Sequence, residues 1–203
     1  MTALLLIRHG PTAWNAAGRV QGQTDVPLSA AGRARVRRWR LPDAFAGFVR
    51  IASPLVRASE TARLLGARPL PTEPRLMEMH WGEWEGATLA GLRARYGEEM
   101  IRNEGRGLDF RAQGGETPRE VQARLLSWTA EVAARGDPVA AVTHRGVIRA
   151  LMAQATGWDM LGKPPHKIGD GCAHLFRLDS TGRPTLDRMN IPLEEPWRDG
   201  GGY

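Results

Sequence analysis

Hydrophobic residues along this chain gather in short runs that alternate with segments of helical periodicity. Four aliphatic runs have the length and composition of buried strands, and they lie at residues 4–7, 48–52, 138–143 and 173–178. Segments with helix start and stop signals lie between them. Strands that alternate with helices predict an α/β fold, with a mainly parallel sheet that helices cover on both faces.

The clearest helix signal begins at Thr117. Thr117 and Glu120 have the spacing of a capping box. Pro118 fits the first helical position, and Gly136 ends the pattern as a C-terminal glycine. Three further helices are predicted at residues 29–39, with Ser29 as N-cap, at 56–65 and after Gly146.

A chain of 203 residues is long enough for one buried α/β domain, which we predict to span residues 1–190. Residues 82–115 interrupt the alternation because they are rich in Gly, Arg and Glu. We predict that they form a small helical excursion over one edge of the domain. Residues 191–203 contain two prolines and three consecutive glycines, which predicts a weakly ordered tail.

The composition is that of a globular protein, with 42% hydrophobic and 25% charged residues. No apolar run approaches the length of about 18 residues that a membrane span needs. The start of the chain lacks the basic segment of a signal peptide, and the single cysteine, Cys172, permits no internal disulfide. We therefore expect a cytoplasmic protein with no membrane partner.

The net charge of +6 and the pI near 10.6 raise the question of a nucleic-acid partner. The basic residues are scattered among acidic ones, however, and their densest cluster, at 33–40, has the spacing of a solvated helix face. No nucleic-acid-binding motif accompanies them. The sequence predicts no nucleic-acid partner, since a small anionic substrate accounts for the surplus charge equally well.

Charged residues follow several of the predicted strands, where ligands collect in open α/β sheets. Arg8 and His9 follow the first strand, and Arg57 lies near the start of the helix after the second. Glu78 follows a short extended stretch, and His144 follows the third strand. We expect these side chains to face one crevice.

This set of residue types suits phosphoryl transfer. A guanidinium group can bind two phosphate oxygens with two parallel hydrogen bonds, and its charge stabilises the negative charge of the transition state. A neutral imidazole can attack phosphorus, and positive neighbours favour the neutral form. A carboxylate can give a proton to the leaving oxygen and later take one from water. The sequence thus predicts transfer through a phosphohistidine without a metal ion.

Metal binding is the competing use of histidine. The five histidines show no H-x-H or H-E-x-x-H spacing, and no cysteine cluster accompanies them. The phosphate-binding pattern GxxxxGK[ST] is also missing, and no GxGxxG follows a strand. The sequence therefore predicts no metal site and no cofactor.

Six blocks occur in order along residues 3–155 and together resemble the histidine phosphatase superfamily, also called the phosphoglycerate mutase-like family. They are RHGPTAWN, QGQTDVPLSAAGRARV, SPLVRASETA, LMEMHWGEWEG, GGETPREVQAR and VTHRGVIRALM. The resemblance implies a three-layer sandwich, in which a mixed, mostly parallel six-stranded sheet lies between helices and a small helical excursion covers the active site. The short excursion and the GGET block are similar to alpha-ribazole phosphatases and broad-specificity phosphatases.

The resemblance also implies a role for each candidate residue. His9 would be the phosphorylated nucleophile, Glu78 the proton donor, and His144 a second catalytic histidine. The phosphate pocket would consist of Arg8, Asn15, Arg57 and His144. Substrate contacts would come from Gln21, Gly22, His80 and Trp81.

Several alternatives stay open at this point. His80, Trp81 and Trp84 could equally pack the excursion, and Glu83 or Glu85 could act as the acid in place of Glu78. Arg145 is expected to point away from the site. Pro11 departs from the family pattern, in which Glu or Gln is usual, and it removes one backbone donor. The segment DGCAHLFRL also lacks the asparagine that often precedes the next strand.

The main hypothesis is a phosphomonoesterase that hydrolyses a small phosphorylated metabolite. The nearest rival is a phosphoglycerate mutase, which would return the phosphoryl group to the substrate. A rival of another class is a catalytically silent module that binds a phosphorylated ligand or a nucleic acid. A homodimer is the default expectation for the oligomeric state.

Overall fold

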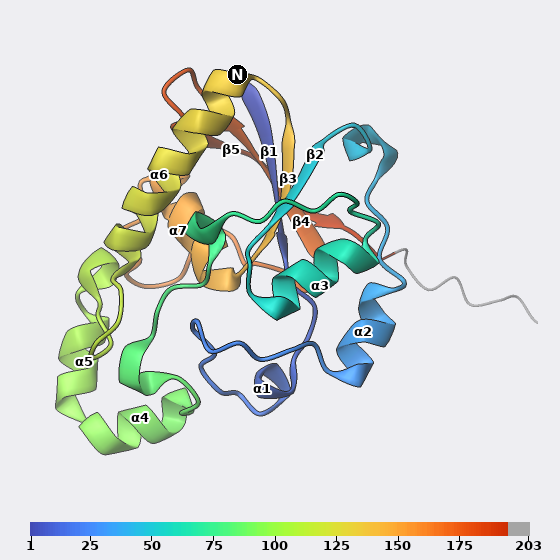
Figure 1. Ribbon diagram of the computed structural model, residues 1–203. Coiled ribbons are helices and arrows are strands. Elements are labelled where there is room, and N and C mark those ends of the chain that lie inside the picture. Colours follow the sequence, from blue (N-terminus) through green and yellow to red (C-terminus); the bar gives the residue numbers. More distant parts are fainter. Residues whose placement is uncertain (195–203) are drawn as a thin grey trace, which may run out of the picture.

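The computed structural model describes residues 1–194 and contains one mixed sheet between two layers of helices (Figure 1). The strands are β1 (Thr2–Arg8), β2 (Val49–Ala52), β3 (Val139–Thr143), β4 (Cys172–Leu178) and β5 (Pro184–Pro192). Their order in the sheet is β2-β3-β1-β4-β5. β3 is parallel to both β1 and β2, whereas β4 is antiparallel to β1 and β5. The predicted α/β sandwich is confirmed.

The sheet of the described chain has five strands, so the six that the family resemblance implied are one too many. Beside β2, residue Thr72 makes only an isolated parallel bridge with Ala52. Pro69, Pro71 and Pro74 surround this bridge. Proline lacks the N–H donor that a strand ladder needs, which explains why pairing stops there.

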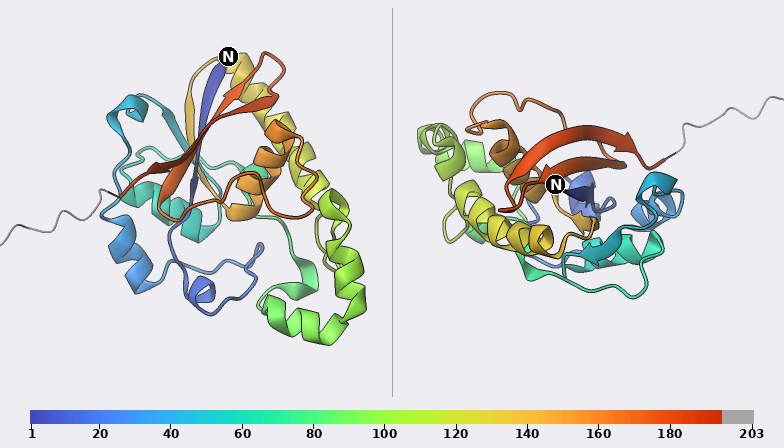
Figure 2. Two further views of the ribbon diagram at one scale, coloured as in Figure 1. Left: turned by 180° about the vertical axis from the view of Figure 1, so that it is seen from behind. Right: turned by 90° about the horizontal axis from the view of Figure 1, so that it is seen from above.

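Seven α-helices and four short 3-10 turns connect the strands in residues 1–194. The helices are α1 (Ala13–Ala16), α2 (Ala30–Val36), α3 (Val56–Leu64), α4 (Leu89–Tyr96), α5 (Glu98–Glu104), α6 (Pro118–Arg135) and α7 (Arg145–Thr156). The 3-10 turns are η1 (Asp43–Phe45), η2 (Pro74–Leu76), η3 (Gly82–Trp84) and η4 (Gly107–Asp109). Helices α6 and α7 cover one face of the sheet, and α2 and α3 cover the other (Figure 2).

Helix α6 has the ends that its sequence predicts. The Thr117 hydroxyl accepts a hydrogen bond from the Glu120 backbone N–H, and the Glu120 carboxylate accepts one from the Thr117 N–H. Gly136 ends the helix in the left-handed conformation, with φ of 79°. Helix α2 is shorter than predicted, since it ends at Val36, three residues before the expected end.

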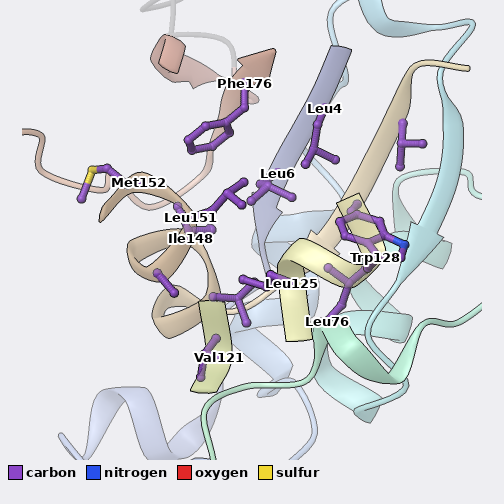
Figure 3. Close-up of a cluster of buried hydrophobic side chains, with 14 of the residues drawn as sticks. Leu4, Leu6, Leu76, Val121, Leu125, Trp128, Ile148, Leu151, Met152 and Phe176 are labelled. Carbon is purple, nitrogen blue, oxygen red and sulfur yellow. The ribbon is translucent and has the colours of Figure 1, made fainter. Parts of the chain in front are cut away.

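Strand β1 supplies both halves of the core because successive side chains point to opposite faces of a sheet. Leu4 and Leu6 pack with α6 and α7, where Phe176 completes the cluster (Figure 3). Leu5 and Ile7 pack with the helices of the other face. A continuous apolar strand is thereby buried on both sides, as expected for the interior of a covered sheet.

The excursion predicted at 82–115 contains η3, α4, α5 and η4. Trp84, Leu92, Met100 and Ala112 form a small apolar cluster of its own. Helices α4 and α5 lie beyond the N-terminal end of α6, on the side of the molecule toward which β1 runs (Figure 1). The excursion therefore stands beside the carboxyl edge of the sheet.

The domain boundary predicted at residue 190 falls inside β5. This edge strand continues to Pro192, and Ile191 and Leu193 are buried against the core. Strand β5 contains many polar residues, so a search for aliphatic runs does not predict it. Residues 195–203 of the predicted tail lie outside the described part of the chain. None of the helices in residues 1–194 has the length and hydropathy needed to cross a membrane.

His174 of β4 is fully buried outside the crevice, and its Nδ1 accepts a hydrogen bond from the Asn190 N–H at 3.2 Å. Burial lowers the pKa of His174 to about 4. The unfolded chain therefore binds a proton at His174 below about pH 6.5 that the folded chain excludes, and the stability of the protein falls as the pH drops from there toward 4.

Replacing His174 by asparagine should remove this component, because the Asn Oδ1 keeps an acceptor for Asn190 without titrating. We compare the free energy of unfolding of the variant with that of the wild type. Between pH 7 and pH 4 we expect this difference to shift by up to about 3 kcal/mol in favour of the variant. Denaturant titrations at the two pH values measure this shift. His166→Asn, at an exposed position, is the matched control. A difference for His174→Asn that is the same at both pH values would contradict the prediction.

Candidate active site

The sheet register places two histidines side by side. Arg8 at the end of β1 is paired with Thr143 at the end of the parallel strand β3. The backbone N–H of His9 continues this ladder by donating to the Thr143 carbonyl at 2.9 Å. The rings of His9 and His144 then lie with their centroids 5.2 Å apart.

The third parallel strand, β2, brings a serine and an arginine to the same place. The Ser53 N–H donates to the Val142 carbonyl, and the Ser53 hydroxyl lies 2.8 Å from Nε2 of His144. Helix α3 follows and carries Arg57, whose side chain is fully buried. Its guanidinium donates to the carbonyls of Thr24 at 2.9 Å and Gly22 at 2.6 Å.

His9 is held as a neutral imidazole with one free nitrogen. Nδ1 lies 2.7 Å from the Gly10 carbonyl, and because a carbonyl can only accept, Nδ1 carries the proton. Nε2 therefore keeps its lone pair. Burial, followed by the positive charges of Arg57 and Arg8, lowers the pKa of His9 to about 3. The ring is thus in its nucleophilic form at neutral and mildly acidic pH.

His144 lies against His9 and is fully buried. Burial, followed by the positive charge of Arg57, lowers its pKa well below the usual range. His144 is not among the residues that line the pocket described below. The structure brings it to the site, and its contact with phosphate stays a prediction.

Three buried nitrogens around His9 have no hydrogen-bond partner within residues 1–194. They are Nε of Arg8, Nε of Arg57 and Nδ1 of His144. A buried polar group without a partner costs about 1–3 kcal/mol, so groups of this kind in a folded protein call for an explanation. Two of the three belong to guanidinium groups, and a bound anion would supply their partner.

The site opens into a pocket of about 580 Å³ that is lined by Arg8, His9, Arg57 and Glu78, among others. Glu78 is fixed by two backbone donors: Oε1 accepts from the Met79 N–H at 2.9 Å and Oε2 from the Gly146 N–H at 3.1 Å. A Cβ at Gly146 would lie 2.2 Å from the Glu78 carboxylate, so only glycine permits this approach. One carboxylate is thus fixed in the pocket that holds the neutral histidine and the two arginines.

The family model for the histidine phosphatase superfamily (branch 1) matches residues 4–192. This chain belongs to the histidine phosphatase superfamily. The prediction that it is an enzyme of the histidine phosphatase type is confirmed. Its finer resemblance to alpha-ribazole phosphatases stays a prediction.

Relatives of this histidine phosphatase carry two kinds of name. A glucosyl-3-phosphoglycerate phosphatase of Mycolicibacterium vanbaalenii is 36% identical over 184 residues, covering 78% of each chain. A 2,3-bisphosphoglycerate-dependent phosphoglycerate mutase 2 of Gloeobacter violaceus is 36% identical over 167 residues, covering 75% of this chain and 74% of the relative. A solved structure of a mycobacterial glucosyl-3-phosphoglycerate phosphatase with VO3 has a TM-score of 0.77 and 28% identity, covering 94% of this chain and all of that one.

The loop after His9 places three further predicted residues in the pocket of this histidine phosphatase: Asn15, Gln21 and Gly22. The Asn15 Oδ1 accepts from the Thr12 N–H at 3.0 Å, and the Thr12 hydroxyl lies 2.8 Å from Gln21 Oε1. Gly22 has φ of 53°, and a Cβ there would lie 1.9 Å from Glu85. The local turn and the approach of Glu85 therefore both require glycine.

The aromatic and imidazole groups after Glu78 divide into two sets. Trp81 lines the pocket and also packs against Phe110, with ring centroids 5.6 Å apart. His80 does not line it; its Nδ1 lies 3.1 Å from the Gly114 carbonyl. Trp84 is buried in the excursion. Trp81 thus serves both uses that the sequence left open, and the structure does not bring His80 to the pocket.

Glu85 holds the loop at residues 22–24, whose Gly22 and Thr24 carbonyls accept hydrogen bonds from Arg57. Its carboxylate accepts hydrogen bonds from the backbone N–H groups of Gln23, Thr24 and Trp81. Burial opposes the charge, but a hydrogen bond from the Thr24 hydroxyl and then these backbone bonds lower the pKa of Glu85 below its usual value. Glu83 is exposed and does not line the pocket. Neither has the position of Glu78 in the pocket.

Asp170 and Arg145 are among the charged residues of the site that sequence reasoning missed. Asp170, in the loop before β4, forms an ion pair with Arg8 that a bound phosphate would have to replace. Arg145 lines the pocket, so the expectation that it points away is wrong. Only the position of Arg145 directly after His144 could have indicated it. Pro11 lines a smaller adjoining pocket, and its carbonyl accepts from the Ser29 N–H at 3.0 Å.

Proposed function

We propose that this protein hydrolyses phosphomonoesters of small metabolites through a phosphohistidine at His9. The observation that carries the proposal is the free lone pair on Nε2 of His9, in a pocket where the Nε–H groups of Arg8 and Arg57 have no partner within residues 1–194. A nucleophile and donors for the phosphate oxygens are the two things that phosphoryl transfer to an enzyme needs.

In the first step the phosphate binds to Arg8 and Arg57, and Arg8 exchanges Asp170 for a phosphate oxygen. Nε2 of His9 forms a bond to phosphorus while the bond from phosphorus to the leaving oxygen breaks with its electron pair. Glu78, in its protonated form, gives that oxygen its proton. The alcohol leaves, and the two arginines hold the phosphoryl group on His9.

In the second step the Glu78 carboxylate takes a proton from a water molecule, whose oxygen attacks phosphorus. The bond between phosphorus and Nε2 breaks, its electron pair returns to the imidazole, and inorganic phosphate is formed. The arginines balance the charge that develops on the phosphate oxygens in both steps. This chemistry needs no metal ion and no organic cofactor.

Glu78 also indicates where the leaving group lies. It lines the larger pocket, whereas the adjoining pocket of about 310 Å³ contains Arg8 and His9 but not Glu78. A leaving oxygen must lie within hydrogen-bond reach of its proton donor. We therefore place the organic part of the substrate in the larger pocket, between α7 and the excursion.

The test of the proposal is a phosphoenzyme that turns over. Incubation with a radiolabelled phosphomonoester and rapid quenching should give a protein-bound label that is labile in acid and stable in base. Hydrolysis of p-nitrophenyl phosphate should accompany it. A protein that releases no phosphate from this ester between mildly acidic and neutral pH would be the silent binding module instead.

The mutase relatives keep phosphoglycerate mutase as the second candidate. Supplying 3-phosphoglycerate and measuring the products separates the two, because a mutase yields 2-phosphoglycerate and a phosphatase yields free phosphate. The absence of a nucleic-acid partner, the cytoplasmic location and the homodimer stay predictions.

A further inference from the structure

Two arginines of α7 line the larger pocket without a polar partner. Arg145 and Arg149 are the first and fifth residues of the helix, so their side chains leave the same face. Within residues 1–194 neither guanidinium forms an ion pair or donates a hydrogen bond to a protein acceptor. The helix thus presents two neighbouring positive charges to the cavity.

The other arginines that line this pocket are partnered. Arg8 pairs with Asp170, and Arg93 pairs with Glu104 at 2.7 Å. Arg19 donates to the Gly86 carbonyl at 2.7 Å, and Arg57 donates to two carbonyls. The free charges on α7 are therefore not a general property of the pocket wall.

Arg149 is held in a partly buried position. Its guanidinium carbon lies 4.8 Å from the ring centroid of Trp158, which fixes the side chain through a cation–π contact. Burial, and then the charge of Arg145, lowers the pKa of Arg149. Arg149 is thus a partly desolvated cation beside the exposed cation of Arg145, an arrangement that a bound anion would stabilise.

The position of α7 connects these charges to the leaving group. Gly146, next to Arg145, donates its N–H to Glu78, the proposed proton donor. Arg149 lies one helical turn further on, about 5–6 Å away. An apolar wall that includes Phe110 and Val121 lines the same cavity. A leaving group in this pocket therefore passes Glu78 and meets the two arginines.

We propose that Arg145 and Arg149 bind a second anionic group, carried by the leaving group of the substrate. The proposal rests on the proposed function, which puts the phosphate at His9 and the leaving group at Glu78. The second group is a carboxylate or a second phosphate, since guanidinium binds both. The volume of about 580 Å³ is in the range of pockets that enclose a whole organic ligand.

Matched pairs of substrates test this directly. 3-Phosphoglycerate and glycerol 3-phosphate differ by a carboxylate, and fructose bisphosphate and fructose 6-phosphate differ by a second phosphate. For each pair the ratio of kcat/KM values measures selectivity for the second anion. We expect the wild type to favour the more acidic member of at least one pair, and Arg149→Gln or Arg145→Gln to lower that ratio about tenfold.

The ratio separates recognition from a structural defect, because damage to the fold lowers both members of a pair together. Arg188→Gln, at an exposed position of β5 outside the pocket, is the control and should keep the wild-type ratio. The pair that loses selectivity identifies the anion as a carboxylate or a phosphate. If neither α7 variant changes either ratio, the inference is wrong. The proposed function still stands in that case, provided that the wild type hydrolyses p-nitrophenyl phosphate. Loss of hydrolysis of every ester by the wild type would instead refute the proposed function.

Discussion

The His9→Ala variant is expected to lose at least about three orders of magnitude in kcat, because the proposed reaction has no other route for the phosphoryl group. The variant should also carry no acid-labile phosphoryl label. His9 is the pocket histidine whose Nδ1 proton is held by the Gly10 carbonyl, which leaves Nε2 as the attacking atom. Quenched-flow labelling and steady-state kinetics measure the two effects.

His166→Ala is the matched control for His9, since residue 166 is exposed and lies outside the pocket. It should keep both the label and the rate. Circular dichroism of both variants shows whether the fold is retained. An undiminished label in His9→Ala would mean that another residue is the nucleophile, and the assignment of His9 would then be wrong.

Replacing Glu78 by glutamine is expected to lower kcat for an alkyl phosphate by about 10²–10⁴, the usual contribution of a positioned acid or base. Glutamine can still accept one of the two backbone hydrogen bonds that hold Glu78. p-Nitrophenolate leaves without prior protonation, so its release should fall much less. The ratio of the two rates is therefore the measurement that reports on proton donation.

Glu83→Gln is the control for this second prediction, because Glu83 is close in sequence but exposed and outside the pocket. It should leave both esters unaffected. An equal fall for the alkyl and the p-nitrophenyl ester in Glu78→Gln would mean that Glu78 only positions the α7 N-terminus. A fall in Glu83→Gln that matched it would assign the acid role elsewhere.

Local patterns in the sequence were sufficient for most of the scaffold. The capping box of Thr117 and Glu120 depends on residues three positions apart, and the predicted start and end of α6 are those observed. The aliphatic runs of β1 and β3 predicted two buried strands. Signals of this kind arise from backbone geometry over a single turn or strand, so they are present before the chain folds.

Edge elements were harder to predict because their residues do not form continuous apolar runs. Only Pro184 and Ile191 of strand β5 are buried, and the strand contains Asp187, Arg188 and Asn190. The expected sixth strand is reduced to the bridge at Thr72 by the surrounding prolines. An edge strand can form with fewer buried apolar side chains than a central strand, so a search for apolar runs does not find it.

The sequence by itself determined which candidate residues meet at one edge of the sheet: Arg8, His9 and His144 lie at strand ends, Arg57 lies at a helix start, and parallel strands end at one edge. Only the tertiary structure decided their contacts. The register joins His144 to Ser53, 91 positions away, and the loop before β4 joins Asp170 to Arg8. Likewise, Arg145 lines the pocket because of the way helix α7 packs, and the residues next to it in the sequence do not determine this. Residue types and strand ends are local properties, whereas partners are set by register and packing between distant segments.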